Sequence, residues 1–219
     1  IVFSSSATIY GLTDNVPIAE DRELSPINPY GRTKVAIENM LQDLSKSFMN
    51  KWKICSLRYF NPVGAHPSGL IGEDPIGIPN NLFPYISQVA IGRRKSLNIF
   101  GNDWNTKDGS GVRDYIHIMD LAEGHIDALD YLNSKDSCLE FINLGSGKGY
   151  SVLEIVTQFE NSTGISIPFS IKSRRDGDVA KSYADIAKAK ELLGWIPIRS
   201  LEQICLDGWN WQRKNPLGY

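Results

Sequence analysis

The chain has 219 residues, of which 42% are hydrophobic and 22% are charged, and its formal net charge is −2. This composition is typical of a globular protein, and the small net charge argues against partners such as nucleic acid or an anionic membrane. No apolar run approaches the roughly 20 residues that a membrane-spanning helix needs.

The first part of the chain predicts two strands joined by a helix. The opening run "IVFSSSA" is typical of a buried parallel strand, which we place at residues 1–5. Proline and polar residues indicate a loop over residues 11–29, and apolar residues at helical spacing predict a helix from 30 to 49. The run "KICSLRYF" at residues 53–60 is the next strand. This order predicts a right-handed βαβ unit with parallel strands.

The rest of the chain continues the alternation after a long Gly/Pro-rich loop at residues 61–80. Asp120 is expected to cap one helix, Ser151 and Glu154 to form a capping box, and Asp185 to start a helix that ends at Gly194. The predicted fold class is therefore α/β. Helices are expected at residues 82–91, 120–132, 151–162, 185–194 and 200–214, and strands at 97–101, 114–118, 140–145 and 167–171.

The three cysteines, Cys55, Cys138 and Cys205, are scattered and lack metal-ligand spacing. We interpret them as reduced cysteines of a cytoplasmic protein. The three histidines form no His-x-x-x-His pattern either, so we predict no bound metal.

Polar side chains lie where the first two strands end, and in open α/β sheets ligands bind beyond the carboxyl ends of the strands. The helix between these strands begins with Tyr30 and Lys34, which are four residues apart and share one face. We therefore expect all these groups to face one cleft. The strand-end residues are Ser4, Ser5, Ser6, Thr8, Tyr59 and Asn61.

Tyr30, Lys34 and Ser6 form a plausible acid–base group. The pKa of a free tyrosine is about 10, too high for a base at neutral pH. A cation one helical turn away favours the phenolate and lowers that pKa. A neighbouring serine hydroxyl could share the proton, so the three residues could take a proton from a sugar or alcohol hydroxyl.

The same spacing occurs at Tyr131 and Lys135, which provides an internal control. This pair lies at the end of a predicted amphipathic helix, and no serine-ended strand precedes it. We interpret Tyr131 as a packing residue and Lys135 as a solvated charge near the helix C-terminus.

Several segments resemble the UDP-glucose (UDP-galactose) 4-epimerase family of the extended short-chain dehydrogenase/reductase superfamily. The long Gly/Pro-rich segment is the most specific of them, and the likeness covers essentially the whole chain. The segments are "SSSATIYG", "NPYGRTK", "LRYFNPVGAHPSGLIGEDPIGIPNNL", "GNDWNTKDGSGVRDYIHIMDLAEGH", "NLGSGKGYSV", "RRDGD" and "NPLGY".

One feature departs from that family, which begins with a Gly-rich turn that binds the NAD pyrophosphate. The nearest match, "GSGKG" at residues 145–149, comes late and is interpreted as a strand-to-helix turn. The resemblance therefore implies the C-terminal part of a longer protein, starting at the fifth strand of a Rossmann sheet. We expect the isolated chain to bind NAD poorly and to be inactive. We also expect residues 1–5 to be less buried than a central strand, because one edge is bare.

The resemblance implies two interleaved domains. Residues 1–61 with parts of 110–150 would form the C-terminal half of a Rossmann-like parallel sheet, the remainder of an NAD-binding domain. Residues 62–109 and 150–219 would mainly form a smaller α/β domain that binds the UDP-sugar.

The resemblance also implies NAD as cofactor and a mechanism in which Tyr30 removes the proton from the sugar O4 while NAD accepts hydride from C4. The resulting 4-keto sugar turns over and receives hydride on its other face, which interconverts UDP-glucose and UDP-galactose. Ser6 would bind O4, and Lys34 would hold the nicotinamide ribose. The implied catalytic residues are thus Ser6, Tyr30 and Lys34, and the implied cofactor-binding residues are Ser4, Tyr30, Lys34 and Tyr59.

The UDP-sugar is implied to bind through arginines on the diphosphate, an aspartate on the ribose and an edge strand on the uracil. The small Ser182 implies that N-acetylated sugars such as UDP-GlcNAc and UDP-GalNAc are also accepted, and the family implies a homodimer. The substrate-binding residues would be Ser6, Ala7, Thr8, Phe60, Asn61, Asn80, Asn81, Leu82, Asn98, Ile99, Phe100, Arg113, Arg175, Asp178 and Ser182.

Three other interpretations stay open. A nucleotide-sugar dehydratase or decarboxylase of the same superfamily shares the Ser/Tyr/Lys group, although dehydratases add acidic residues near the serine strand and "SSSATIYG" has none. The chain could instead be a catalytically incompetent fragment that only dimerises. A sugar-binding module would leave the Tyr30–Lys34 pair unexplained.

Overall fold

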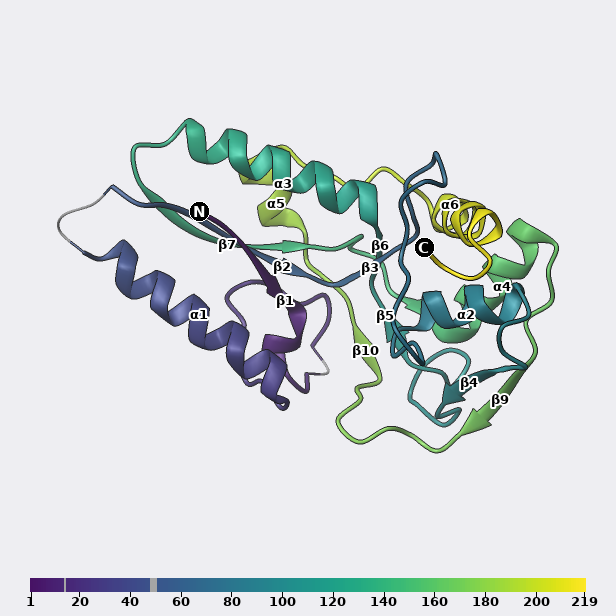
Figure 1. Ribbon diagram of the computed structural model, residues 1–219. Helices are drawn as coiled ribbons and strands as arrows, with labels where there is room; N and C mark the ends of the chain where they lie inside the picture. Colours follow the sequence, from purple (N-terminus) through teal and green to yellow (C-terminus); the bar gives the residue numbers. More distant parts are fainter. Residues whose placement is uncertain (14, 48–50) are drawn as a thin grey trace.

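The computed structural model describes residues 1–13, 15–47 and 51–219. Its largest sheet is parallel, in the order β1-β2-β7, and helix α1 covers one face while α3 and α5 cover the other (Figure 1). This confirms the predicted α/β class and the parallel pairing of the first two strands. The elements are β1 (Val2–Ser6), β2 (Lys53–Tyr59), β7 (Cys138–Leu144), α1 (Pro29–Ser45), α3 (Ile118–Asn133) and α5 (Ala187–Leu193).

Strand β1 lies at the edge of this sheet. In β2, residues 54–58 are all buried, whereas in β1 only Ser5 is, with 1% of its surface exposed. Ile1 is 49% exposed. Within the described part of the chain β1 pairs with β2 alone. The prediction that residues 1–5 are less buried than a central strand is therefore confirmed.

The start of α1 is set by local capping. The side chain of Asn28 accepts a hydrogen bond from the backbone N–H of Gly31 at 2.7 Å, and Pro29 occupies the first helical position. The helix ends at Ser45, four residues earlier than the expected 49. Residues 48–50, where the expected end falls, lie outside the described residues.

A buried polar network fixes α1 against the sheet. Arg58 on β2 donates to both carboxylate oxygens of Glu38 on α1, at 3.1 and 2.7 Å, and Ser56 donates to the same carboxylate. Arg58 also donates to the hydroxyl of Tyr10, and burial raises the pKa of Tyr10 to about 12, so that hydroxyl stays neutral. Because Glu38 and Arg58 are both buried, loss of either would leave an uncompensated charge in the core.

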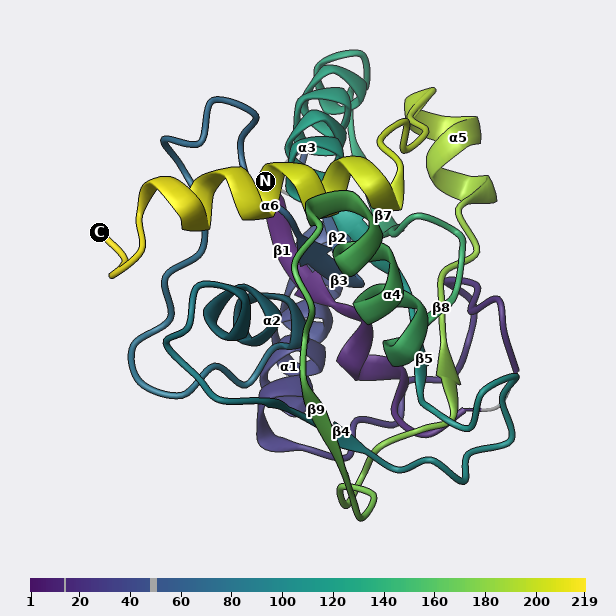
Figure 2. The same ribbon diagram turned by 90° about the vertical axis from the view of Figure 1, so that its right-hand side faces the viewer.

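The second half of the molecule is built around helices α2, α4 and α6 and several short sheets (Figure 2). Helices α2, α4 and α6 enclose a core in which Phe83 and Phe159 meet edge to face. Strand β4 pairs with β9, β3 pairs with β6, and β5 lies between β10 and β8. The bounds are α2 (Leu82–Ala90), α4 (Val152–Thr163), α6 (Leu201–Lys214), β3 (Asn61–Val63), β4 (Leu97–Phe100), β5 (Val112–Arg113), β6 (Tyr115–His117), β8 (Tyr150–Ser151), β9 (Phe169–Lys172), β10 (Lys181–Ser182) and the 3-10 helix η1 (Ala7–Tyr10).

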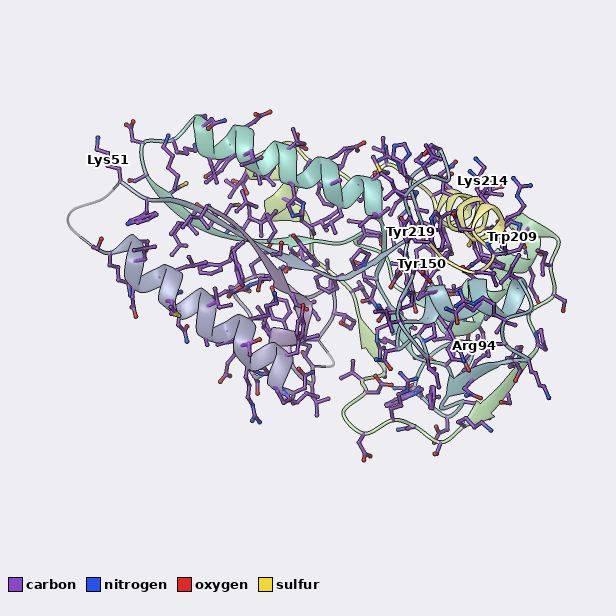
Figure 3. The ribbon with its side chains drawn as sticks, viewed as in Figure 1. Lys51, Arg94, Tyr150, Trp209, Lys214 and Tyr219 are labelled. Atoms are coloured by element: carbon purple, nitrogen blue, oxygen red, sulfur yellow. The ribbon has the colours of Figure 1, made fainter. Side chains whose placement is uncertain are left out.

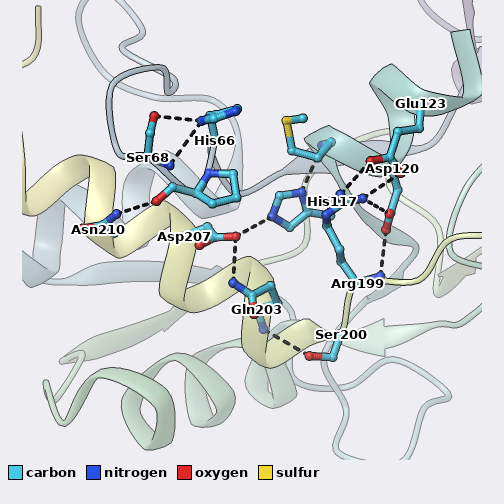
Figure 4. Close-up of polar contacts among 12 residues, drawn as sticks. His66, Ser68, His117, Asp120, Glu123, Arg199, Ser200, Gln203, Asp207 and Asn210 are labelled. Carbon is cyan, nitrogen blue, oxygen red and sulfur yellow. Dashed lines mark hydrogen bonds and ion pairs between the residues drawn. The ribbon is translucent and has the colours of Figure 1, made fainter. Parts of the chain in front are cut away.

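Asp120 was expected to cap α3, and this prediction is wrong. The cap is His117, whose Nδ1 accepts the backbone N–H of Met119 at 3.0 Å. Asp120 lies within the first turn, where its carboxylate accepts two hydrogen bonds from Arg199 (Figure 4). The carboxylate of Asp120 therefore binds Arg199, on the loop before α6, instead of the backbone N–H groups at the start of α3.

The ends of two other predicted helices can be compared with the structure. The reciprocal capping box of Ser151 and Glu154 at the start of α4 is confirmed. Helix α5 begins at Ala187, two residues after Asp185, and ends as predicted at Gly194, whose φ of 67° suits a residue without a Cβ. Among the described residues, no helix has the length and apolar character required to cross a bilayer.

Candidate active site

A cavity of about 480 Å³ opens between β4, β5, the start of α2 and the loop before β10. Segments far apart in the sequence meet here, and most of the predicted substrate-binding residues line the cavity. These are Asn61, Asn80, Asn81, Leu82, Asn98, Ile99, Phe100, Arg113, Arg175 and Asp178.

Charged groups are paired across the cavity. Arg113 on β5 donates to the carboxylate of Asp178 at 3.1 Å. This bond links two of the residues that are predicted to bind UDP. The guanidinium group of Arg175 stacks on the ring of Phe100, 3.7 Å from its centroid. Planar guanidinium groups suit bidentate binding of phosphate, and an aromatic face suits a nucleobase. The cavity thus offers both kinds of contact that a nucleoside diphosphate needs.

The edge of the cavity is lined by backbone and amide groups of β4. Asn98 accepts a hydrogen bond from the hydroxyl of Ser170 on β9, at 3.1 Å. Arg94, which Figure 3 labels, stacks on Tyr85 of α2, 4.9 Å from the ring centroid. Tyr85 itself lines the cavity.

The end of β1 carries the predicted acid–base residues. Ser6 caps η1, and its hydroxyl oxygen accepts hydrogen bonds from the backbone N–H and the hydroxyl of Thr8, at 3.3 and 3.1 Å. The ammonium group of Lys34 donates to the carbonyl of Ser4 at 2.8 Å and lies 5.3 Å from the ring centroid of Tyr30. Tyr30 is 54% exposed. Lys34 thus links the start of α1 to β1.

On the other face of the sheet, the hydroxyl of Tyr59 donates to the hydroxyl of Ser4 at 2.6 Å and also contacts the ring of His125 on α3. His125 in turn bonds the carbonyl of Leu121 at 2.8 Å. Burial raises the pKa of Tyr59, which keeps its hydroxyl a hydrogen-bond donor. Ser4 and Tyr59, both predicted to bind cofactor, are therefore in direct contact.

The control pair behaves as interpreted. Tyr131 is half-buried and packs against the core cluster beside β7, and Lys135 lies 4.7 Å from its ring centroid. The two Tyr–Lys pairs thus share both the spacing and the stacked cation. They differ in surroundings, because only Lys34 also bonds a strand at the edge of the sheet.

Five predicted substrate-binding residues do not line the cavity. Ser6, Ala7 and Thr8 lie at the end of β1 and in η1. Phe60 is buried in the cluster that contains Ile9 and Tyr10. Ser182 lies on β10, paired with Arg113 of β5, and is half-buried. Its backbone carbonyl accepts the N–H of Asp114 at 3.0 Å.

The "GSGKG" segment follows β7 as a turn that leads to β8 and α4, as interpreted. Asp114, which is buried, accepts hydrogen bonds from the backbone N–H groups of Ser146, Gly147 and Ala184. Burial raises the pKa of Asp114, and these bonds oppose that effect. The turn is thus tied to the strand that carries Arg113.

Sequence reasoning missed several residues that line the cavity, among them Tyr85, Trp104 and Tyr115. Trp104 lies within "GNDWNTKDG", a segment whose pattern contributes only to the family likeness. Tyr115 follows Arg113 at the alternating spacing of a strand, which was the available signal. His125 also escaped notice, since a single histidine on a helix carries no pattern.

The family model described as GDP-mannose 4,6 dehydratase matches residues 1–207. The chain belongs to this family. The chain is similar to UDP-glucose 4-epimerases. It is 58% identical to the one from Dictyostelium discoideum over 219 residues and 56% identical to the one from Bacillus subtilis (strain 168) over 220. Each match covers 100% of this chain but only 63% and 64% of the relatives. The chain thus spans less than two thirds of their length.

Solved structures agree. The UDP-glucose-4-epimerase of Stenotrophomonas maltophila, with bound NAD and formylated UDP-arabinopyranose, has a TM-score of 0.95 and 49% identity over 98% of this chain and 63% of that one. The enzyme of Bifidobacterium longum in complex with NAD⁺ and UDP has a TM-score of 0.94 and 47% identity, covering 100% and 65%. The predicted Rossmann-like class and the resemblance to UDP-glucose 4-epimerases are confirmed.

Proposed function

We propose that the full-length protein containing this chain interconverts UDP-glucose and UDP-galactose by NAD-dependent transient oxidation at the sugar C4. The observation that carries the proposal is the cavity that brings Arg113, Arg175, Asp178 and Phe100 together from separate segments. The similarity to UDP-glucose 4-epimerases over the whole chain supports the same activity.

In this proposal the cavity binds the UDP moiety. Arg113 and Arg175 hold the diphosphate, and Asp178 accepts a hydrogen bond from a ribose hydroxyl. Phe100 offers an aromatic face to the uracil, while the backbone of β4 reads its edge. Binding of UDP replaces the present contact between Arg113 and Asp178. Arg113 then binds the diphosphate and Asp178 binds the ribose.

The chemistry is assigned to Ser6, Tyr30 and Lys34. Tyr30 takes the proton from the sugar O4 and later returns it, Ser6 donates a hydrogen bond to O4, and Lys34 holds the end of β1 beside Tyr30. The donors at this edge fit a nicotinamide nucleotide, because the Lys34 ammonium and the Ser4 and Tyr59 hydroxyls can all bind ribose oxygens. When bound, NAD supplies the hydride acceptor.

The test is epimerisation by the full-length protein, with Tyr30→Phe compared with the matched variant Tyr131→Phe. We expect Tyr30→Phe to lower kcat by about a hundredfold or more, because it removes the group that moves the proton. Tyr131→Phe should leave kcat unchanged. Equal activity of the two variants would refute the assigned role. Analysis of the products by NMR separates an epimerase, which yields UDP-galactose, from a dehydratase or decarboxylase of the same superfamily.

We further propose that N-acetylated UDP-sugars are accepted. Ser182 is small and lies next to Arg113 on the neighbouring strand, which supports room beside the sugar. Epimerisation of UDP-GlcNAc should occur in the wild-type protein and be lost selectively in Ser182→Tyr. Activity on UDP-galactose with none on UDP-GlcNAc in the wild-type protein would rule this out.

A homodimer through α1 is proposed as well, since this helix exposes Ile37 and Met40, the latter 69% exposed. Size-exclusion chromatography of the full-length protein, with Met40→Glu as the variant, tests it.

The free thiols of Cys55, Cys138 and Cys205 support location in the reducing cytoplasm. Localisation of a tagged full-length protein tests that assignment.

A further inference from the structure

Two consecutive arginines stack on two aromatic residues at the end of β4 and in the loop that follows it. Arg175 lies on Phe100, at 3.7 Å, and Arg174 lies on Trp104, at 3.9 Å. Phe100 and Trp104 are themselves joined, because the indole N–H of Trp104 donates to the carbonyl of Phe100 at 3.3 Å. The two stacks therefore form one unit at the rim of the cavity.

Arg174 is paired with Asp103 outside the cavity. Its Nε donates to the carboxylate of Asp103 at 2.8 Å, and its Nη2 donates to the carbonyl of the same residue at 2.6 Å. Arg174 holds the pKa of the Asp103 carboxyl below its usual value. Unlike Arg175, Arg174 does not line the cavity. Its charge is thus already compensated by Asp103, and it is poorly placed to be a phosphate ligand.

The loop is shaped to admit this stack. Gly101 has a φ of 82°, and a Cβ at this position would come within 2.5 Å of the indole nitrogen of Trp104. Gly101 also donates its N–H to the carbonyl of Lys172 at 2.8 Å, where β4 and β9 end side by side. The Trp104 ring therefore lies beside Phe100 at the end of β4. The paired strand β9 ends at Lys172, directly before the segment that carries Arg174.

We propose that Trp104 and Arg174 are a positioning pair that holds Arg175 and Asp178 ready for the nucleotide. The segment from Arg174 to Asp178 has no regular strand or helix to hold it, and the stack on Trp104 anchors its start. Without that anchor, binding would have to order this segment first, and the entropy cost would weaken affinity. This inference rests on the proposed binding of UDP in the cavity.

The experiment measures UDP binding to the full-length protein by isothermal titration calorimetry. Arg174→Ala and Trp104→Ala should each weaken binding by about three- to tenfold, the range expected for a cation–π contact with its ordering effect. In the Trp104→Ala background, Arg174→Ala should add less than about twofold, because the two residues act through one contact. Trp104→Phe, which keeps an aromatic face, should restore most of the affinity.

Asp103→Asn distinguishes positioning from direct ligation. If Arg174 positions its neighbours, loosening it from Asp103 weakens UDP binding. If Arg174 were instead a phosphate ligand restrained by Asp103, the same variant would bind UDP more tightly. Steady-state kinetics give a second readout: in Arg174→Ala, KM for the UDP-sugar should rise while kcat stays the same.

The control is Lys135→Ala, which removes a similar surface cation from the ring of Tyr131 and should not change UDP affinity. Circular dichroism and thermal unfolding show whether each variant is folded, and Trp104→Phe and Arg174→Lys serve if an alanine variant is not. Wild-type affinity in Arg174→Ala, or tighter binding in Asp103→Asn, overturns the inference. Failure of the wild-type protein to bind UDP overturns the proposed function and this inference with it.

Discussion

The cavity around Arg113 and the end of β1 around Ser6 are organised in opposite ways. The cavity is lined by segments of this chain that lie far apart in the sequence, from Asn61 to Asp178. The end of β1 lies at the sheet edge, with Tyr30 half exposed and Lys34 bonded to a backbone carbonyl. The proposed UDP site is thus a cavity lined by several segments, whereas the proposed acid–base group lies on an exposed edge of the sheet.

The largest expected effect separates the two ligands in the 219-residue chain itself. UDP should bind measurably, because this chain itself supplies the residues that line the cavity, whereas a fluorescence titration with NAD should show weak binding or none. The physical reason is that this sequence lacks a Gly-rich turn at a helix N-terminus for the pyrophosphate. Tight NAD binding by the chain alone would erase the contrast between the two regions.

The next effect concerns the buried ion pair that packs α1 against the sheet. Glu38→Gln removes the charge that compensates Arg58 in the core, and we expect it to lower the free energy of unfolding by about 3–5 kcal/mol. Asp43→Asn, an exposed change on the same helix, should stay within about 0.5 kcal/mol of wild type. Urea unfolding measures both. If the two variants were equally stable, the buried network would not be what holds Tyr30 in place.

On the cavity side, Arg113→Ala should weaken UDP binding by about 10- to 100-fold, since a hydrogen bond to a charged group contributes about 1.5–3 kcal/mol. Removal of an equal charge in Arg32→Ala, at an exposed residue of α1, should have little effect. Calorimetric titration of both variants with UDP makes the comparison. A similar loss in both would mean that UDP responds to overall charge rather than to this cavity.

The smallest effect is a pH dependence at the contact between β6 and α6, outside both regions. His117 before α3 donates to Asp207 of α6 at 3.1 Å, and Gln203 donates to the same carboxylate at 2.9 Å (Figure 4). Burial lowers the pKa of His117, an effect that Asp207 opposes. The unfolded chain, with a His pKa of about 6.5, therefore binds more protons than the folded one just below that pH.

Stability from His117 is thus fully present above about pH 6.5 and falls as the pH drops toward its lowered folded pKa. In His117→Gln this decrease in the free energy of unfolding with falling pH should disappear. In His66→Gln, a change in a surface loop, it should remain. Urea unfolding at several pH values between about 5 and 7.5 shows the difference. An identical slope in wild type and His117→Gln would exclude this histidine as the source.

Local patterns predicted local features well. The capping box of Ser151 and Glu154 needs only residues three apart, and it forms as expected. Asp120 shows the limit of such reasoning, because its carboxylate binds Arg199, nearly eighty residues away, while His117 caps the helix. Trp104 was overlooked for the same reason: its partner Arg174 is seventy residues distant.

The sequence by itself determined the alternation of strands and helices, the polar strand ends and the family likeness, because each depends on neighbours along the chain. Only the tertiary structure decided which side chains share a cavity and how the two Tyr–Lys pairs differ. Tyr30–Lys34 and Tyr131–Lys135 have the same spacing and the same stacked cation. What separates them is the bond from Lys34 to β1, and such a contact exists only once α1 has packed on the sheet.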